Sequence, residues 1–184
     1  PEWSLLSQSA PVFTEEDLEW FQIDNETDYA PNLSALLISE LSWDLADDGP
    51  RVLILHTHGT ESYTPSPGES YIENGDYRTL DEGYNMISIG DRVAARLEEA
   101  GIGVIHHREL HDYPSYNGSY ANARQSMETI LEDNPGIVLV LDLHRDAAAT
   151  DQGQMDTSAT INGQESAQLM IVVGTDAGGL DHPN

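Results

Sequence analysis

Apolar residues in this chain come in short continuous runs, and polar segments separate the runs. Each run is rich in Val, Ile and Leu and is only a few residues long, which is typical of strands that are buried on both faces. These runs predict strands at 51–57, 102–105, 137–143 and 169–173.

Two segments between the strands instead place apolar residues three and four positions apart, which is the spacing of one helix face. The first covers 85–100 and stops at Gly101, and the second covers about 118–133 and stops at Asn134-Pro135-Gly136. Strands that alternate with helices in this order predict an α/β fold, with a mainly parallel sheet flanked by helices.

The rest of the chain is less regular. Thr14 before three acidic residues is typical of a helix N-terminus, and the leucines of 33–45 have the spacing of another helix. Residues 62–83 form a polar loop rich in Tyr, Gly and Pro, and loops of this length are usually functional. We expect 1–20 to be an N-terminal extension and 21–184 to form one domain.

The charge of the chain is strongly acidic. Its 184 residues include 33 Asp and Glu against 7 basic residues, all of them Arg, for a net charge of -26. Such a charge argues against binding to nucleic-acid backbones and to anionic lipid, and favours a well-solvated surface. No apolar run is long enough to predict a membrane-spanning helix, and without cysteine the chain has no disulfides or thiolate zinc sites.

Two of the predicted strands end in histidine. His56, His58 and Glu61 come at and after the end of the strand at 51–57, and His144 follows the strand at 137–143. Because the carboxyl ends of parallel strands meet at one edge of the sheet, where ligands bind in open α/β folds, these side chains predict one shared site.

The residue types at this edge suit a catalytic zinc ion. Zinc takes neutral imidazole nitrogen and carboxylate oxygen, and three protein ligands leave a position for a water whose pKa falls to about 7. His58, Glu61 and His144 are the predicted ligands; His56, two positions from His58 on an extended strand, is the alternative ligand or an orienting group. Strand-end histidines with ordinary hydrogen bonds are the simpler interpretation.

Three further histidines follow the strand at 102–105. His106, His107 and His111 could form a second metal cluster, although partly exposed loop histidines are the commoner occurrence.

Four segments carry a resemblance to a known family. They are HTHGTESY at 56–63, NMISIGD at 85–91, HDYPSYNGSY at 111–120 and LDLHRDA at 141–147. Together with FQIDNETDY at 21–29, they make residues 21–184 similar to the stage II sporulation protein P family.

The resemblance implies a fold like that of zinc amidases and carboxypeptidases, and a zinc-dependent N-acetylmuramoyl-L-alanine amidase that cleaves the glycan–peptide amide of peptidoglycan during forespore engulfment. It also implies stage II sporulation proteins D and M as partners, and a location on the cell-wall side of the mother-cell membrane, where full-length members are anchored. A metallo-endopeptidase or carboxypeptidase acting on stem peptides or cross-links, and a catalytically inactive wall-binding module, are the alternatives.

The resemblance places His58 and His144 at zinc-binding positions. The third ligand is Glu61 or, from its position before the helix at 85–100, Asp81. Family members continue past Asn184 into a segment with a general-base Glu, so we expect slow hydrolysis, or none, by this chain alone.

Other residues are candidates for substrate contacts. Arg145 follows a predicted ligand and is a candidate catalytic and substrate-binding residue that could hold a substrate carboxylate, or could pair with a nearby Asp. Asn117 and Arg124 are weaker candidates for the same pocket. In the loop 62–83, we expect aromatic residues to stack on sugar and peptide, namely Tyr63, Tyr71, Tyr77 and, just after it, Tyr84.

Overall fold

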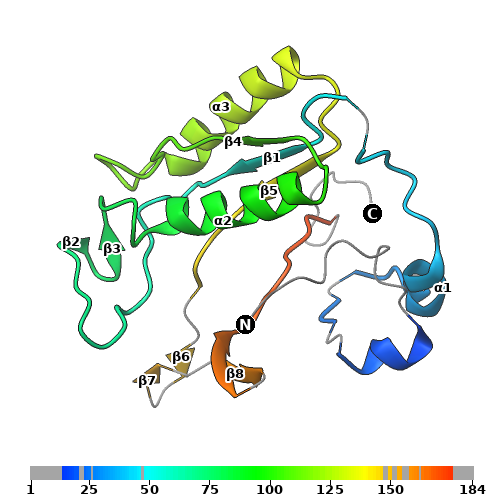
Figure 1. Ribbon diagram of the computed structural model, residues 1–184, viewed down its shortest axis with the longest axis horizontal. Helices are drawn as coiled ribbons and strands as arrows, with labels where there is room; N and C mark the ends of the chain where they lie inside the picture. The colour runs from blue at the N-terminus through cyan, green and yellow to red at the C-terminus, as the bar shows by residue number, and fades with distance from the viewer. Residues whose placement is uncertain are drawn as a thin grey trace. The chain divides into compact units, whose positions relative to one another are not determined.

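The structure is a computed structural model that describes residues 14–20, 23–25, 27–46, 48–146, 149–150, 153–154, 158–161 and 163–175 (Figure 1). The chain divides into two compact units. The described residues of the first unit run from 42 to 146, and those of the second fall within 14–41 and 149–175.

A parallel sheet of three strands forms the centre of the first unit. Strand β1 (Val52–Leu55) lies between β4 (Val104–His106) and β5 (Leu139–Asp142) and runs parallel to both. All four residues of β1 are at most 3% exposed. The α/β fold with a parallel sheet flanked by helices is therefore confirmed.

Two helices cover the two faces of this sheet (Figure 1). Val52 and Ile54 pack against α2 (Met86–Glu99), whereas Leu53 and Leu55 pack against α3 (Ser119–Asp133). Alternate residues of a strand point to opposite faces, so a central strand needs apolar residues at every position. This requirement explains the unbroken apolar run in the sequence.

The small elements differ from the sequence prediction. The N-terminal segment forms a 3-10 helix, η1 (Glu15–Trp20), and α1 (Leu33–Ile38) is shorter than predicted. Helix α1 has no buried residue, and short helices need tertiary packing to persist. The loop 62–83 contains an antiparallel hairpin of β2 (Glu73–Gly75) and β3 (Arg78–Thr79).

The C-terminal part of the second unit consists of two antiparallel pairs. Strands β6 (Ala149–Thr150) and β7 (Gly153–Gln154) form one, and β8 (Ser158–Ile161) and β9 (Gln164–Ala167) form the other. The predicted strand at 169–173 is wrong: these residues are in no strand, and each is 65–88% exposed. Apolar residues favour a strand where neighbouring strands pack on them, and the described residues supply no such neighbour.

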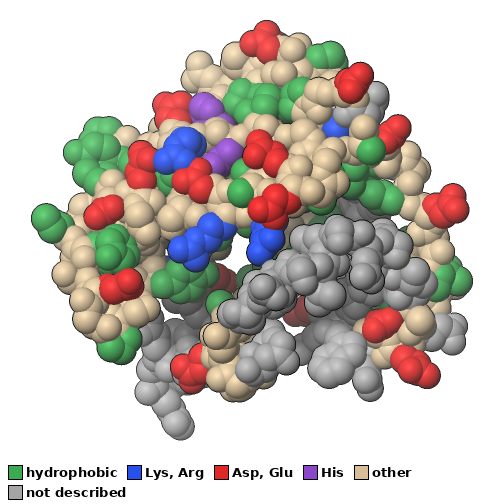
Figure 2. All heavy atoms as spheres, in the orientation of Figure 1, with side chains coloured by type: hydrophobic (Ala, Val, Ile, Leu, Met, Phe, Trp, Pro, Cys, Tyr) green, Lys and Arg blue, Asp and Glu red, His purple; other side chains and the backbone are tan. Residues whose placement is uncertain are grey.

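Acidic side chains are spread over the visible surface of the described residues (Figure 2). Several of the few arginines pair with them, as Arg96 does with Glu99 and Arg124 with Glu128. In the part of the chain that the structure describes, no helix is long and apolar enough to cross a membrane.

A pair of histidines joins the sheet to α2. His56 Nε2 lies 2.9 Å from His106 Nε2, and the other ring nitrogens face the Leu143 carbonyl at 3.1 Å and Asp91 at 3.0 Å. Gly90 of α2 makes room for this pair, since a Cβ there would lie 2.3 Å from His106 Nε2 and 2.6 Å from His56 Nε2. The glycine is therefore required by packing.

We predict that Gly90→Ala lowers the free energy of unfolding by about 1–3 kcal/mol, because overcrowding of a packed site costs this much. The loss would occur despite a gain of up to about 1 kcal/mol from the higher helix propensity of Ala. Thermal and urea unfolding measure it. Ala95→Ser, on the exposed side of the same helix, is the control and should change stability by less than about 0.5 kcal/mol. Unchanged or increased stability of Gly90→Ala would contradict the prediction.

Candidate functional site

The candidate site lies past the carboxyl ends of β1 and β5, as the sequence predicts. A turn after β1 brings Glu61 back to His58, with the Glu61 N–H 3.2 Å from the His58 carbonyl. Strand β5 leads directly to His144, whose ring centroid is 5.3 Å from that of His58. The structure thus brings together His58, Glu61 and His144.

Glu61 is only 7% exposed, and its carboxylate is held on both oxygens. Oε2 accepts a 2.9 Å hydrogen bond from the backbone N–H of Arg145 and lies 3.7 Å from His144 Nδ1, while Arg78 donates to Oε1 at 3.3 Å. Burial alone would raise the pKa of Glu61, but these donors and the nearby positive charges lower it. The side chain is therefore an ionised carboxylate.

His144 lies between two carboxylates. Its Nε2 is 3.0 Å from Asp142 Oδ2, and its Nδ1 faces Glu61. Hydrogen bonds to Asp142 and Glu61 raise the pKa of His144 to about 10. Asp142 is fixed in turn by the backbone N–H and the hydroxyl of Thr57, at 2.8 and 2.6 Å. A carboxylate behind an imidazole in this way is the usual support of a metal-ligating histidine.

His58 supplies a free nitrogen to the same place. The residue is 4% exposed, and its buried Nδ1 has no hydrogen-bond partner among the described residues. Burial lowers the pKa of His58, so the ring is neutral and keeps a lone pair. Its ring stacks on Tyr116, with centroids 4.6 Å apart and planes 8° apart, and meets the edge of Tyr120 at 5.3 Å.

These residues fit a zinc ion by type and by their surroundings. The unpaired Nδ1 of His58, the ionised Glu61 and the supported ring of His144 are two imidazoles and a carboxylate. Their ligand atoms, however, do not all lie within 4.8 Å of one another. Among the described residues, the group that has this spacing is His107, Glu109 and His111.

A buried ion-pair network lies beside Glu61. Arg78 donates to Asp112 at 2.7 Å and to the Thr60 hydroxyl at 3.2 Å, and Thr60 donates to Asp112 at 2.6 Å. The Asp112 side chain is 0% exposed. Arg78 also stands over the ring of Tyr116, 4.9 Å from its centroid. From the sequence, Asp112 is a possible partner of Arg145, but in the structure it pairs with Arg78. The sequence gives no signal for Arg78, because only the folded hairpin brings the two residues together.

Arg145 lies at the edge of the site. Its guanidinium donates to the Tyr77 carbonyl at 3.2 Å and stands 5.8 Å from the Tyr77 ring centroid. Since its backbone N–H binds Glu61, the residue links the candidate metal ligands to the β2–β3 hairpin.

The other predicted residues have different surroundings. Strand β1 ends at Leu55, so the predicted strand face shared by His56 and His58 does not form. Both ring nitrogens of His56 face hydrogen-bond partners. Asp81 accepts from the Gly83 N–H in a turn. Asn117 is exposed, and Arg124 is exposed on α3, where it pairs with Glu128. The contacts of the described residues connect none of these last three to His58 or His144.

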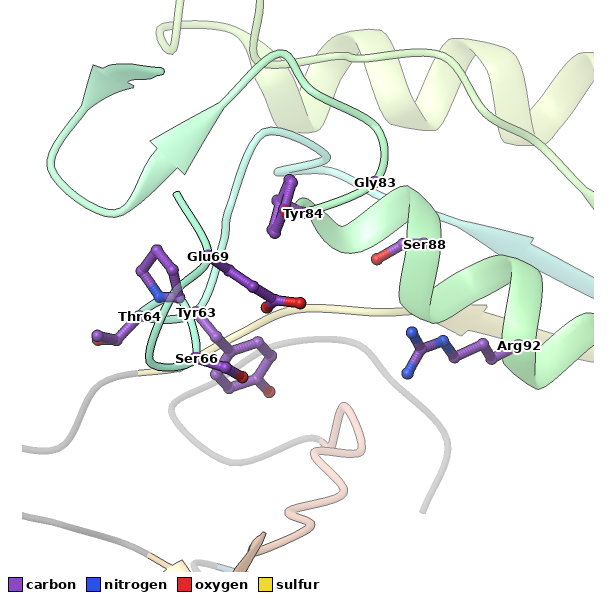
Figure 3. A pocket seen from close by; sticks show the side chains of 9 residues that line it. Tyr63, Thr64, Ser66, Glu69, Gly83, Tyr84, Ser88 and Arg92 are labelled. Carbon is purple, nitrogen blue, oxygen red and sulfur yellow. The ribbon is translucent and has the colours of Figure 1, made fainter. Parts of the chain in front are cut away.

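The loop tyrosines are divided between two places. Tyr77 is at Arg145, and the Tyr71 hydroxyl bonds to Ser62 and to the Tyr63 carbonyl at 2.9 and 3.1 Å. Tyr63 and Tyr84 line a pocket of about 400 Å³ between the loop and α2. Figure 3 shows Glu69 of the loop and Arg92 of α2 on its two sides. The pocket is lined by neither His58 nor His144, so it is separate from the histidine site.

We predict that Arg78→Met destabilises the first unit by about 3 kcal/mol, because it leaves the buried carboxylate of Asp112 without its partner. The measurement is urea unfolding. Arg96→Met is the matched control: its pair with Glu99 is exposed, with side chains 48% and 61% accessible, and such pairs contribute less than about 1 kcal/mol. Equal losses of unfolding free energy for the two substitutions would show that the Arg78 network does not stabilise the first unit.

Comparison with known proteins agrees with the resemblance in the sequence. The family model of stage II sporulation protein P matches residues 7–184. Stage II sporulation protein P of Bacillus subtilis (strain 168) is 27% identical over 205 residues, which cover 93% of this chain and 49% of that protein. The chain thus spans about half the length of this curated relative. No solved structure matches significantly. Since the family model covers nearly the whole chain, the chain belongs to the stage II sporulation protein P family.

Proposed function

We propose that this chain is a zinc-dependent peptidoglycan hydrolase that cleaves the amide between N-acetylmuramic acid and L-alanine of the stem peptide. The observation that carries the proposal is the unpaired, buried Nδ1 of His58 beside Glu61 and a His144 supported by Asp142. Membership of the stage II sporulation protein P family supports a role in sporulation and supports peptidoglycan as the substrate.

The residues would divide the work in the following way. A zinc ion bound by His58, Glu61 and His144 supplies a Lewis acid for the scissile carbonyl and lowers the pKa of a bound water. Asp142 holds His144 through Nε2, so that Nδ1 faces Glu61. The Arg145 N–H and Arg78 hold the carboxylate of Glu61 in one orientation. The contacts from Asp142, Arg145 and Arg78 hold His144 and Glu61 in place before the ion binds.

Substrate contacts come from the rim of the site. Tyr116 and Tyr120 are 55% and 66% exposed and contact the ring of His58, so their free surfaces are available to a sugar or peptide. Arg145, whose backbone N–H binds Glu61 and whose guanidinium lies at Tyr77, has a planar cation suited to a carboxylate of the stem peptide.

We also propose a location and partners, on the basis of family membership. A peptidoglycan hydrolase must act on the cell-wall side of a membrane, and we place this chain on that side of the mother-cell membrane. Stage II sporulation proteins D and M are its proposed partners. Both statements are supported by family membership rather than by a described contact.

We predict that His58→Gln and His144→Gln each bind one zinc ion fewer than the unmodified chain, because two remaining ligands hold the ion poorly. Elemental analysis after dialysis measures the metal. Where the unmodified chain hydrolyses purified peptidoglycan, the products should be glycan strands and intact stem peptides, and both variants should lose this activity. Glu98→Gln, an exposed carboxylate of α2, is the control. Cleaved stems would indicate an endopeptidase, and unchanged zinc content would contradict the site.

We predict that Arg145→Met weakens muramyl-peptide binding by about 10- to 100-fold, as expected from the loss of a charge-assisted hydrogen bond. Zinc content should stay the same, since the Arg145 backbone N–H that holds Glu61 is retained. The matched control is Arg124→Met, because Arg124 is exposed and pairs with Glu128. Calorimetric titration of a muramyl peptide measures both; equal affinity of the two variants would remove Arg145 from the substrate site.

A further inference from the structure

A second group of metal-ligand side chains follows strand β4. His107, Glu109 and His111 each offer a ligand atom, and the three atoms all lie within 4.8 Å of one another. We propose that these residues form a second zinc site, distinct from the one at His58 and His144. The proposal does not depend on the hydrolase function, because the two groups share no residue.

The local backbone explains why the three side chains meet. Residues 107–110 form no helix or strand in the structure, and the three residues alternate along this segment. In extended chain, alternate residues share a side. Arg108, between the first two, forms ion pairs with Asp91 and Glu82 instead. The pattern His-x-Glu-x-His therefore places the three ligand side chains apart from Arg108.

The ring of His111 is held in an orientation that suits a metal ligand. It is 2% exposed, and its Nδ1 lies 2.8 Å from the His56 carbonyl, which can only accept a hydrogen bond. In the neutral ring Nδ1 must therefore carry the proton, which makes Nε2 the nitrogen that can bind a metal. A backbone carbonyl that fixes the tautomer in this way is a common support of ligating histidines.

Ser126 of α3 marks where that lone pair points. Its hydroxyl is 3.1 Å from His111 Nε2 and 3.4 Å from Glu109 Oε2. The Nε2 of His111 and the carboxylate of Glu109 thus face the same small volume.

His107 completes the group with a nitrogen that makes no hydrogen bond. Its Nε2 is buried and has no hydrogen-bond partner among the described residues, although Glu109 Oε2 lies 3.3 Å away. A buried ring nitrogen without a partner is costly, and a metal ion would remove that cost.

The donor set selects the ion. Two imidazoles and one carboxylate suit zinc and similar transition metals, whereas calcium and magnesium prefer oxygen ligands. Glu109 has 62% of its side chain exposed, so solvent can reach the group.

Such an ion would hold a structurally important segment. The segment is attached to β1 through the His56 carbonyl and to α3 through Ser126, and it leads directly into Asp112, the partner of Arg78. Zinc binding would therefore stabilise the segment 107–112, whose Asp112 binds the Arg78 that contacts Glu61.

The test uses a parent variant, His58→Gln/His144→Gln, which removes the first site. After treatment with chelator, zinc chloride is titrated calorimetrically into this parent and into versions that also carry His107→Gln, Glu109→Gln or, as control, Glu132→Gln. Glu132 is an exposed carboxylate of α3. We expect the parent and the control to bind one zinc ion, and the other two versions to bind it at least about 100-fold more weakly.

A stability measurement provides a second readout. Zinc at about 100 times its dissociation constant should raise the thermal midpoint of the parent by about 5 °C or more, and should not raise that of the His107→Gln version. His107→Gln in the otherwise unmodified chain should remove one zinc ion even if the parent folds poorly.

The outcomes separate the two sites. Zinc that is lost with His107→Gln but kept in the parent supports the second site, even if the hydrolase site fails. A parent that binds no zinc, together with an unchanged zinc content when His107→Gln or Glu109→Gln is made in the otherwise unmodified chain, would overturn the second site and leave the first.

Discussion

The turn that follows β1 is the constraint on which the rest of the first unit depends. Strand β1 is fully buried between two parallel strands and two helices, so the chain must leave it at the carboxyl edge of the sheet. The next residues then connect all three strand ends: the His56 carbonyl binds His111, Thr57 binds Asp142 and Thr60 binds Asp112. The polar groups of one short turn are thus paired by segments from β4 and β5, and the site is assembled as these strands align.

Charge balance explains the protonation of this site. Glu61, Asp142 and Asp112 place three carboxylates near one another, and Arg78 neutralises part of this charge. His144 supplies the rest as an imidazolium, which is why its pKa rises to about 10. A divalent cation would do the same with more charge and would take the place of the proton on the ring nitrogen that faces Glu61. Proton and metal therefore compete for one position.

The sequence predicts the parts of the molecule whose pattern depends on local burial. Its apolar runs locate β1, β4 and β5, and its helical periodicity locates α2 and α3 within a few residues. It fails at 169–173, where apolar residues find no strand to pair with. Arg78 and Asp112 could not be paired from sequence, because the contact spans 34 positions and depends on the β2–β3 hairpin. Glu109 could have been found, since His-x-Glu-x-His in an extended segment places three ligands on one side.

The two histidine groups have a common physical origin. In a parallel sheet the residues that follow each strand lie at the same edge. The histidines after β1, β4 and β5 therefore lie at one edge of the sheet. What separates them into two groups is the pairing of His56 with His106, which uses both rings for packing against Gly90 of α2. His58 and His144 then remain on the side of Glu61, and His107 and His111 on the side of Ser126. Asp112 connects the two groups. It follows His111 in the chain, and its carboxylate binds Arg78, which in turn binds Glu61.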